Sequence, residues 1–282
     1  YEKASMRFGT CEKCKEYNKR NEDNKCNEDS KYNENNKCND DKSGYNYGFA
    51  FCHKHDISQQ YSNKNDEIDN FIKVAQNKSK YYDKIIEWIP FERLENIEKI
   101  GEGGFGIVYS ATWIDGKRKY VIEKNQVKIS REQNCTVALK CLDSNDTSKF
   151  INEFKAYYEC QRKRYDIEKY GLETYGITYK PDEPDKLGKG KYMMVFEYAD
   201  KGDLGNYVSK NFAVLKWKQK IEILCSISDN LNHIHEQDYC HGDFHSGNIL
   251  MTSVEDFKDL KIKTFTFGSK AVAISQNTGS KS

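Results

Sequence analysis

The sequence predicts an α+β fold that follows a long polar segment at the amino-terminal end. Apolar, β-branched stretches joined by a glycine-rich turn at residues 97–114 indicate two strands. Farther along, residues 217–231 carry apolar side chains at the spacing of one helix face. Hydrophobic residues make up only 37% of the chain, below the roughly 45–50% of ordinary globular domains, so part of the chain lies outside any hydrophobic core.

Charge and hydropathy narrow the class of protein. Lys and Arg number 45 and Asp and Glu number 44, so the formal charge is +1 and no basic field attracts nucleic acid. The longest apolar run, residues 192–196, is strand-sized, whereas a membrane-spanning helix needs roughly 20 residues. We therefore expect an intracellular, cytoplasmic protein with no nucleic-acid partner and no membrane span.

The polar excess lies in the first predicted region, residues 1–57. Within it, the polar sequence of residues 21–27 recurs almost unchanged at residues 33–39. Segments of this composition bury too little apolar surface to offset the entropy of ordering them. We expect this repeat to be a disordered, Asn-rich insertion.

Two ligand pairs flank that insertion and predict a zinc knuckle. Cys11-x-x-Cys14 and Cys52-x-x-His55 have the spacing of paired zinc ligands, and a tetrahedral Zn²⁺ accepts three thiolates and one imidazole. His53 is an alternative to His55 as the fourth ligand. The alternatives to zinc are unpaired side chains in an unfolded segment and, less favoured, disulfides.

The second predicted region, residues 58–91, is a linker that contains an amphipathic helix. Its helical signal is a set of apolar residues at i, i+3, i+4 and i+7, namely Ile68, Phe71, Ile72 and Ala75. An apolar anchor that includes the sequence E-W-I-P at residues 87–90 follows.

The glycine-rich turn has the pattern G-x-G-x-x-G, formed by Gly101, Gly103 and Gly106 and followed by Val108. Glycines let backbone N–H groups approach phosphates without obstruction by a Cβ atom. A Rossmann unit would continue as a helix after the last glycine, but residues 108–113 continue as a strand. A plain hairpin with glycines in its turn is the alternative interpretation.

A lysine and a glutamate that could form an ion pair follow the glycine-rich turn. Lys140 ends the apolar strand of residues 137–140, and Glu153 lies thirteen residues later in a segment with helical spacing. Glu153 can hold Lys140 in place, with Glu159 as the alternative acid. A lysine at a strand end that simply extends into solvent is the competing interpretation.

The next elements are a strand at residues 192–199, a polar helix start at residues 200–204, and a long helix. We expect that helix to bury one face, which carries Trp217, Ile221, Leu224, Ser228 and Leu231.

The most specific motif is the loop of residues 241–250, His-Gly-Asp-Phe-His-Ser-Gly-Asn-Ile-Leu. Asp243 and Asn248 keep the five-residue spacing of the motif H-R-D-L-x-x-x-N. In that motif the carboxylate orients a substrate hydroxyl and accepts its proton, while the amide holds magnesium beside the phosphates.

On these motifs, in this order, the chain resembles the eukaryotic protein kinase family over about residues 92–268. It is most similar to tyrosine-kinase-like Ser/Thr kinases. It is also similar to the expanded kinase families of arbuscular mycorrhizal fungi, in which a cysteine module and an E-W-I-P segment precede the glycine loop. The resemblance implies a bilobal fold with a β-rich N-lobe and a helical C-lobe, over a kinase domain at residues 92–282.

The resemblance also implies the site. Lys140, Glu153, Asp243 and Asn248 would be catalytic, ATP and Mg²⁺ would be the cofactors, and Asn248 would ligate Mg²⁺. Phe196 would be the gatekeeper, and the backbone of Glu197 and Ala199 would face adenine. The implied nucleotide-binding set is Gly101, Glu102, Gly103, Gly104, Phe105, Gly106, Val108, Ala138, Lys140, Phe196, Glu197, Ala199 and Asn248. The expected partner is a protein substrate or a signalling protein, and residues 115–134 are expected to be an inserted loop.

Several departures favour a pseudokinase or signalling scaffold as the alternative. Gly242 replaces the arginine of the catalytic motif, and His245 stands where many Ser/Thr kinases carry lysine. The magnesium motif D-F-G is replaced by Thr266-Phe267-Gly268, since Asp256 follows Asn248 too soon for an intervening hairpin. Threonine is a poor ligand for a hard dication. The chain ends fourteen residues after Gly268, so we expect a truncated C-lobe with exposed apolar surface at Leu224 and Leu231.

Overall fold

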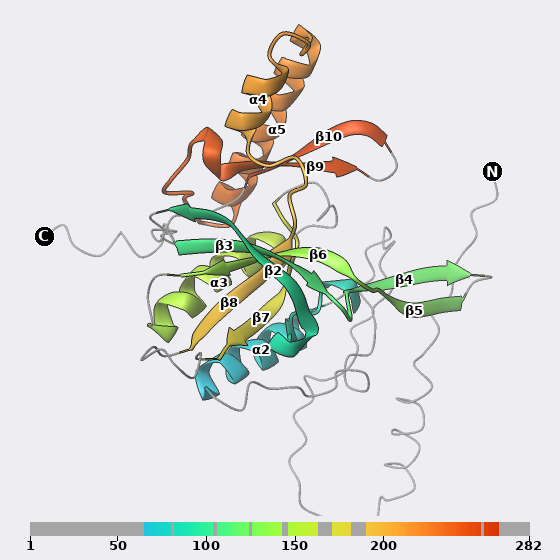
Figure 1. Ribbon diagram of the computed structural model, residues 1–282, viewed down its shortest axis with the longest axis vertical. Coiled ribbons are helices and arrows are strands. Elements are labelled where there is room, and N and C mark those ends of the chain that lie inside the picture. Colours follow the sequence, from blue (N-terminus) through green and yellow to red (C-terminus); the bar gives the residue numbers. More distant parts are fainter. Residues whose placement is uncertain are drawn as a thin grey trace, which may run out of the picture.

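The computed structural model describes residues 65–79, 82–103, 106–123, 126–142, 146–162, 171–181, 190–254 and 257–264. A sheet-rich lobe comes first in the chain, and a smaller lobe of helices with a two-stranded ribbon follows it (Figure 1). This arrangement confirms the predicted α+β fold with a β-rich first lobe and a helical second lobe.

The first lobe is built on a six-stranded sheet in the order β1-β7-β8-β6-β3-β2. Its neighbouring strands pair antiparallel, except that β1 pairs parallel with β7. The strands are β1 (Glu87–Trp88), β2 (Leu94–Gly103), β3 (Gly106–Trp113), β6 (Cys135–Cys141), β7 (Thr174–Lys180) and β8 (Lys191–Glu197).

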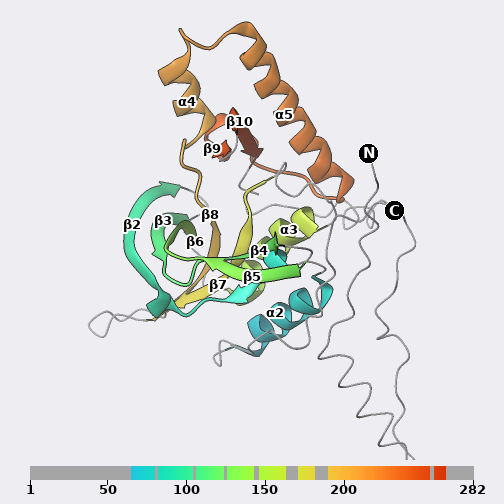
Figure 2. The ribbon, with the colours of Figure 1, turned by 90° about the vertical axis from the view of Figure 1, so that its right-hand side faces the viewer.

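Both faces of this sheet are covered, which explains why the four buried residues of β8, at positions 193–196, are all apolar. Because side chains alternate along a strand, Met194 and Phe196 belong to one buried cluster and Met193 and Val195 to another. The first cluster lies under helices α2 (Asp66–Lys78) and α3 (Thr147–Arg162), and Figure 2 shows both helices on the same side of the curved sheet.

Helix α2 is the helix expected from the apolar spacing before the glycine loop. Asn65 caps its first turn by accepting hydrogen bonds from the N–H groups of Glu67 and Ile68. Ile68 and Ile72 are fully buried, and the ring of Phe71 packs edge-on against Phe154 of α3 at 5.5 Å between centroids. The helix is therefore part of the first lobe's packing.

The segment after α2 leads into the sheet through two short 3₁₀ turns, η3 (Tyr82–Lys84) and η4 (Phe91–Arg93), on either side of β1. Gly176 of β7 lets β1 approach closely, because a Cβ atom there would lie 2.0 Å from the carbonyl oxygen of Glu87. The E-W-I-P segment thus forms the edge strand of the sheet.

Residues 115–134 are not the inserted loop that was expected. They form a hairpin of strands β4 (Lys117–Glu123) and β5 (Gln126–Glu132), which projects from the sheet in Figure 1. The expectation was wrong because the segment also holds residues that favour strands, namely the run at residues 120–122 in β4 and Val127 and Ile129 in β5. Lys117 lies opposite Glu132, with 3.3 Å between Nζ and Oε2.

The second lobe contains α4 (Leu204–Asn211), α5 (Trp217–Glu236), the short turn η6 (Ser246–Asn248) and the ribbon of β9 (Ile249–Val254) with β10 (Phe257–Thr264). Asp203 caps α4 by accepting a hydrogen bond from the N–H of Asn206 at 2.9 Å. A small apolar cluster joins these elements and consists of Leu204, Ile227, Ile249 and Met251, with partly buried Tyr207, Val208, Ile223 and Leu231.

The expectation that the predicted face of α5 is buried was wrong, since Ser228 is exposed as well as the residues that precede it on that face. The buried positions of the helix are instead Ile227, Asn230, His233 and Ile234. Trp217, Ile221 and Leu224 are 78%, 51% and 58% exposed. The exposure expected at Leu224 is observed, whereas Leu231 packs on the small cluster. None of the helices in the described ranges combines the length and apolar composition that a membrane crossing requires.

Candidate active site

The glycine-rich turn joins β2 to β3 at the edge of the sheet, where Gly103 pairs with Gly106. Gly106 has a φ of +117°, and a Cβ atom there would lie 2.0 Å from the carbonyl oxygen of Cys141. Only glycine therefore fits at this position. Glu102 forms an ion pair with Lys99 in β2, while Gly104 and Phe105 lie outside the described residues.

Lys140 and Glu153 meet in the interior of the first lobe. Lys140 lies on β6 opposite Val108 of β3, and Glu153 is on α3. The Lys140 Nζ donates to Glu153 Oε1 at 2.7 Å, and the two residues are only 4% and 7% exposed. Glu159, the alternative acid, instead accepts a hydrogen bond from the hydroxyl of Tyr239.

A third group at this pair was missed by the sequence analysis. The Lys140 Nζ also donates to the hydroxyl of Tyr157 at 3.0 Å. Burial disfavours the charged ammonium, but the interactions with Tyr157 and Glu153 outweigh it and raise the pKa of Lys140 above its ordinary value. The available signal was the position of Tyr157, four residues after Glu153 and so on the same helix face.

The expected adenine-contacting segment begins where β8 ends. Phe196 lies opposite Ala138 of β6 and is 1% exposed. The N–H of Glu197 donates to the carbonyl of Glu173 at 2.8 Å, and the carbonyl of Ala199 accepts from the N–H of Gly202 at 3.1 Å. These bonds fix the path of the chain between the lobes, and the roles toward adenine stay predictions.

Asp243 and Asn248 lie side by side in the loop before β9. The Asn248 Nδ2 donates to the Asp243 carboxylate at 2.5 Å and to its carbonyl at 2.9 Å. The N–H of Asp243 donates to Nδ1 of His241 at 3.3 Å. Because the amide nitrogen of Asn248 faces Asp243, its amide oxygen is the atom that a metal ion would bind.

The substituted residues of this loop have local structural roles. Gly242 has a φ of +74°, a conformation that glycine adopts without strain, so an arginine here would be strained. His245 places Nε2 3.3 Å from the Asp243 carboxylate, and its Nδ1 accepts a hydrogen bond from the N–H of Gly247. His245 can thus contact the same carboxylate that the motif assigns to proton transfer.

The ribbon after the loop supports the placement of the magnesium motif at residues 266–268. Phe257 opens β10, the strand that returns alongside β9, whereas Asp256 lies outside the described residues. Strand β10 ends at Thr264, two residues before Thr266. Thr266, Phe267 and Gly268 themselves lie outside the described residues.

The two halves of the site lie within electrostatic range of one another. Burial, foremost, lowers the pKa of His241; the carboxylate of Asp243 opposes the shift, and the charges of His245 and Lys140 add to it. Of these charges, that of Lys140 belongs to the first lobe and the other two to the loop itself. A substrate that spans both halves would meet a cation on one side and a carboxylate with an amide oxygen on the other.

This set of side chains fits ATP and Mg²⁺ in its chemistry. Lys140 supplies a cation for phosphate, while Asn248 and Asp243 supply oxygen ligands of the kind that Mg²⁺ prefers. Within the described ranges, no group of three or more His, Cys, Asp and Glu side chains is arranged to hold a metal ion. Cys11, Cys14, Cys52, His55 and His53 lie outside those ranges, so the zinc knuckle stays a prediction.

The fold and the site together define a class, the phosphotransferases with a β-rich lobe and a helical lobe. A family model for protein tyrosine and serine/threonine kinases matches residues 94–280, and the chain belongs to this family.

The chain is similar to several protein kinases of other organisms. The chain is 29% identical over 168 residues to the probable serine/threonine-protein kinase roco5 of Dictyostelium discoideum, an alignment that covers 58% of this chain. It is 26% identical over 212 residues to LysM domain receptor-like kinase 3 of Medicago truncatula, and 28% identical over 158 residues to the probable serine/threonine-protein kinase PBL20 of Arabidopsis thaliana, covering 73% and 54% of this chain. These alignments span 5%, 28% and 34% of the three relatives. The similarity to the fungal families stays a prediction.

Proposed function

We propose that this chain transfers the γ-phosphoryl group of ATP to a serine or threonine hydroxyl, with tyrosine as the alternative, on a protein that takes part in signal transduction. The observation that carries the proposal is the buried ion pair of Lys140 and Glu153, which join at 2.7 Å from different elements. Relatives named as serine/threonine-protein kinases support the choice of hydroxyl.

The first lobe would bind and orient the phosphates. Lys140 is held by Glu153 with its ammonium charged, so it offers a fixed cation to the phosphate oxygens. The backbone of the glycine-rich turn adds N–H donors, and Gly103 has no atom within 4 Å of where a Cβ would lie. A charged, preoriented donor stabilises phosphoryl transfer without reorganisation during the reaction.

The second lobe would handle the proton and the metal. Asp243 would accept the proton of the attacking hydroxyl, and Asn248 holds that carboxylate in place through its amide nitrogen. The amide oxygen of Asn248 would bind Mg²⁺, which when bound neutralises charge on the phosphates.

A pseudokinase or signalling scaffold is the second candidate, and a specific observation favours it. Thr266 stands in the magnesium motif where the family has aspartate, so one charged metal ligand is replaced by a neutral hydroxyl. Losing a charged group at such a site costs roughly 10²–10³ in rate. In this alternative the chain would bind nucleotide weakly or not at all and act through protein contacts.

The test is calorimetric titration of ATP into the full chain, with Mg²⁺ and then with a chelator, followed by a phosphorylation assay. We expect Mg²⁺-dependent binding that Lys140→Ala abolishes and that Lys149→Ala, which removes an exposed lysine of α3, leaves unchanged. Because Lys140→Ala leaves Glu153 buried without its partner, the double variant Lys140→Met/Glu153→Gln serves as a second, better-folded comparison.

The assay separates the two candidate functions. Asp243→Asn should retain ATP binding and lower phosphoryl transfer by roughly 10²–10⁴. Binding of ATP with no transfer by the wild-type chain would favour the pseudokinase. No binding in either buffer would contradict both the kinase proposal and the nucleotide-binding form of the pseudokinase.

A further inference from the structure

The Lys140–Glu153 pair has a third member that no family motif assigns. Tyr157 is four residues after Glu153 on α3 and is 2% exposed. Its hydroxyl accepts a hydrogen bond from the Lys140 Nζ at 3.0 Å and lies 3.4 Å from Glu153 Oε1, to which it can donate. One turn of α3 therefore contacts the ammonium group twice.

The contact to Tyr157 is a hydrogen bond and not an interaction with the ring face. The Lys140 Nζ is 3.0 Å from the hydroxyl oxygen but 5.5 Å from the ring centroid, so it lies beyond the hydroxyl end of the side chain. An ammonium group has three N–H donors. Glu153 and Tyr157 engage two of them, and the third is suited to a phosphate oxygen.

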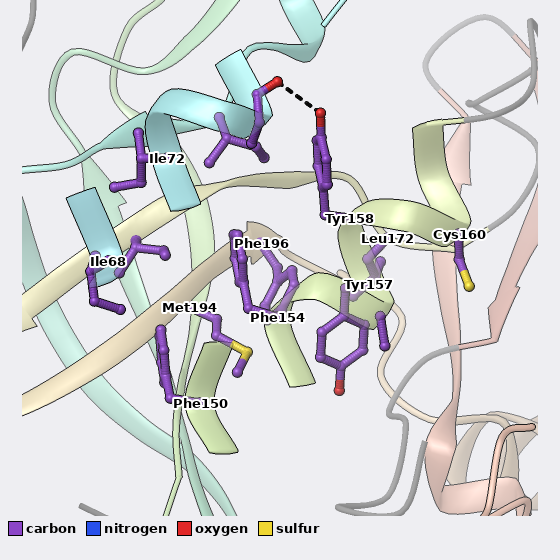
Figure 3. Packing of buried hydrophobic residues seen from close by; sticks show 14 of the residues in the cluster. Ile68, Ile72, Phe150, Phe154, Tyr157, Tyr158, Cys160, Leu172, Met194 and Phe196 are labelled. Atoms are coloured by element: carbon purple, nitrogen blue, oxygen red, sulfur yellow. Dashed lines mark hydrogen bonds between the residues drawn. The ribbon is translucent and has the colours of Figure 1, made fainter. Parts of the chain in front are cut away.

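The ring of Tyr157 is held in place by aromatic packing. It meets the ring of Phe196 edge-on, with 5.1 Å between centroids and an interplanar angle of 74°. Figure 3 shows Tyr157 with Phe196 and Phe154 in the same buried cluster. Burial, foremost, raises the pKa of Tyr157 to about 12, so its hydroxyl is protonated at neutral pH and can both accept and donate. The side chain is thus fixed in position and in protonation state.

We propose that Tyr157 is a positioning residue that, together with Glu153, fixes the Lys140 ammonium for binding to nucleotide phosphates. The inference rests on the proposed function, since it assigns Lys140 to ATP. Lysine has a flexible four-carbon side chain, and one acceptor leaves the ammonium free to pivot around a single bond. Two acceptors on one helix face restrict that motion and direct the remaining N–H.

The test compares the affinities of the full chain for ATP with Mg²⁺ and for adenosine, which lacks phosphates. Tyr157→Phe keeps the ring and removes only the hydroxyl. We expect it to weaken ATP binding about tenfold, as for the loss of one hydrogen bond to a charged group, and to leave adenosine binding unchanged. In the Lys140→Met background, Tyr157→Phe should have no further effect on ATP binding.

A matched control is available on the next residue of the same helix. Tyr158 is also buried, and its hydroxyl donates to the carbonyl of Ala75 in α2 at 2.8 Å, which is the dashed line in Figure 3. Tyr158→Phe removes a buried tyrosine hydroxyl without touching Lys140. It should lower the melting temperature and leave the ratio of ATP affinity to adenosine affinity unchanged.

The outcomes distinguish this inference from the proposed function. If Lys140→Met weakens ATP binding and Tyr157→Phe does not, the inference is wrong and the function stands. If Tyr157→Phe weakens ATP and adenosine binding equally, Tyr157 acts only through packing, and the inference is again overturned. If the wild-type chain binds ATP no more tightly than adenosine, the phosphates contribute no affinity. The proposed function then fails, and the inference fails with it.

Discussion

Whether a buried ionisable side chain of this protein is charged depends on the groups that surround it. Lys140 stays an ammonium in a nearly dry environment because Glu153 and Tyr157 contact it directly. His241 lies close to a carboxylate as well, but burial, foremost, lowers its pKa and outweighs the attraction of Asp243, so the neutral form is favoured. The two groups illustrate opposite outcomes of burial at the same site.

The lowered pKa of His241 predicts a loss of stability on acidification. Its folded-state pKa lies below the ordinary value of 6.5, so the unfolded chain binds the proton more readily. The stability that His241 contributes is therefore fully present above pH 6.5 and is lost as the pH falls through the folded-state pKa. We expect urea unfolding to show this decline below pH 6.5, by about 1.4 kcal/mol for each unit of pKa difference.

The substitution His241→Asn keeps an acceptor for the N–H of Asp243 and should flatten the decline. His235→Asn, at an exposed histidine of α5, should leave it in place. Asp115 and Glu132 also have lowered pKa values, but their ordinary values are 3.8 and 4.5. Their effect on stability therefore falls at lower pH than that of His241. Parallel curves for the wild-type chain and His241→Asn between pH 5 and pH 7 would refute the assignment.

Among the elements, α2 and α3 form the most consequential pair, because α3 carries Glu153 and α2 covers its outer side. Aromatic contacts join them, with Phe71 against both Phe154 and Tyr158, and the hydroxyl of Tyr158 donates to the carbonyl of Ala75. The side chain of Gln76 also donates to the carbonyl of Ile86 at 2.9 Å, which ties the end of α2 to the segment before β1. We propose that residues 66–89 fold as part of the kinase domain, whereas the predicted boundary at residue 92 stays a prediction.

This proposal predicts that a core substitution in α2 destabilises the whole domain. Ile72 is fully buried, so Ile72→Ala should lower the free energy of unfolding by about 2–5 kcal/mol. Val74 lies on the same helix and is 40% exposed, so Val74→Ala should cost less than about 1 kcal/mol. Urea unfolding followed by circular dichroism measures both values. Equal, small effects of the two substitutions would mean that α2 is an independent linker.

Over the whole molecule, the two lobes differ in how completely they bury their apolar surface. The first lobe packs both faces of its sheet, whereas the described part of the second lobe has one small cluster, which includes Met251. Large apolar side chains on α5 and in the turn before it stay at the surface, namely Phe212, Val214, Trp217, Ile221 and Leu224. Exposed apolar surface of this kind favours association between molecules.

We therefore expect this 282-residue chain to self-associate with increasing concentration. The double variant Trp217→Lys/Leu224→Lys should shift the sedimentation profile toward the monomer. A charge-matched control, Ser228→Lys/Asn232→Lys, changes two exposed polar positions of the same helix and should not. A wild-type chain that sediments as a monomer across the accessible range of concentrations would contradict the prediction.

Local patterns in the sequence were sufficient to predict features that depend only on the spacing of residues along one helix or turn. The helical spacing of apolar residues, at i, i+3, i+4 and i+7, predicted α2. The glycine pattern predicted the turn between β2 and β3. The same reasoning failed for residues 115–134, because a polar composition was interpreted as a loop although the segment also holds β-branched and aromatic residues that favour strands. It also misjudged α5, since periodicity shows which side chains share a face but not whether another element covers that face.

The sequence by itself determined the family, the order of the motifs and the pairing of Lys140 with Glu153, because residue types and spacings carry that information. Only the tertiary structure decided that Tyr157 joins this pair and that α2 packs on α3. Both depend on which helix faces meet across the sheet, and that choice is made by the summed packing of residues distant in the chain. Such contacts leave no motif in the sequence.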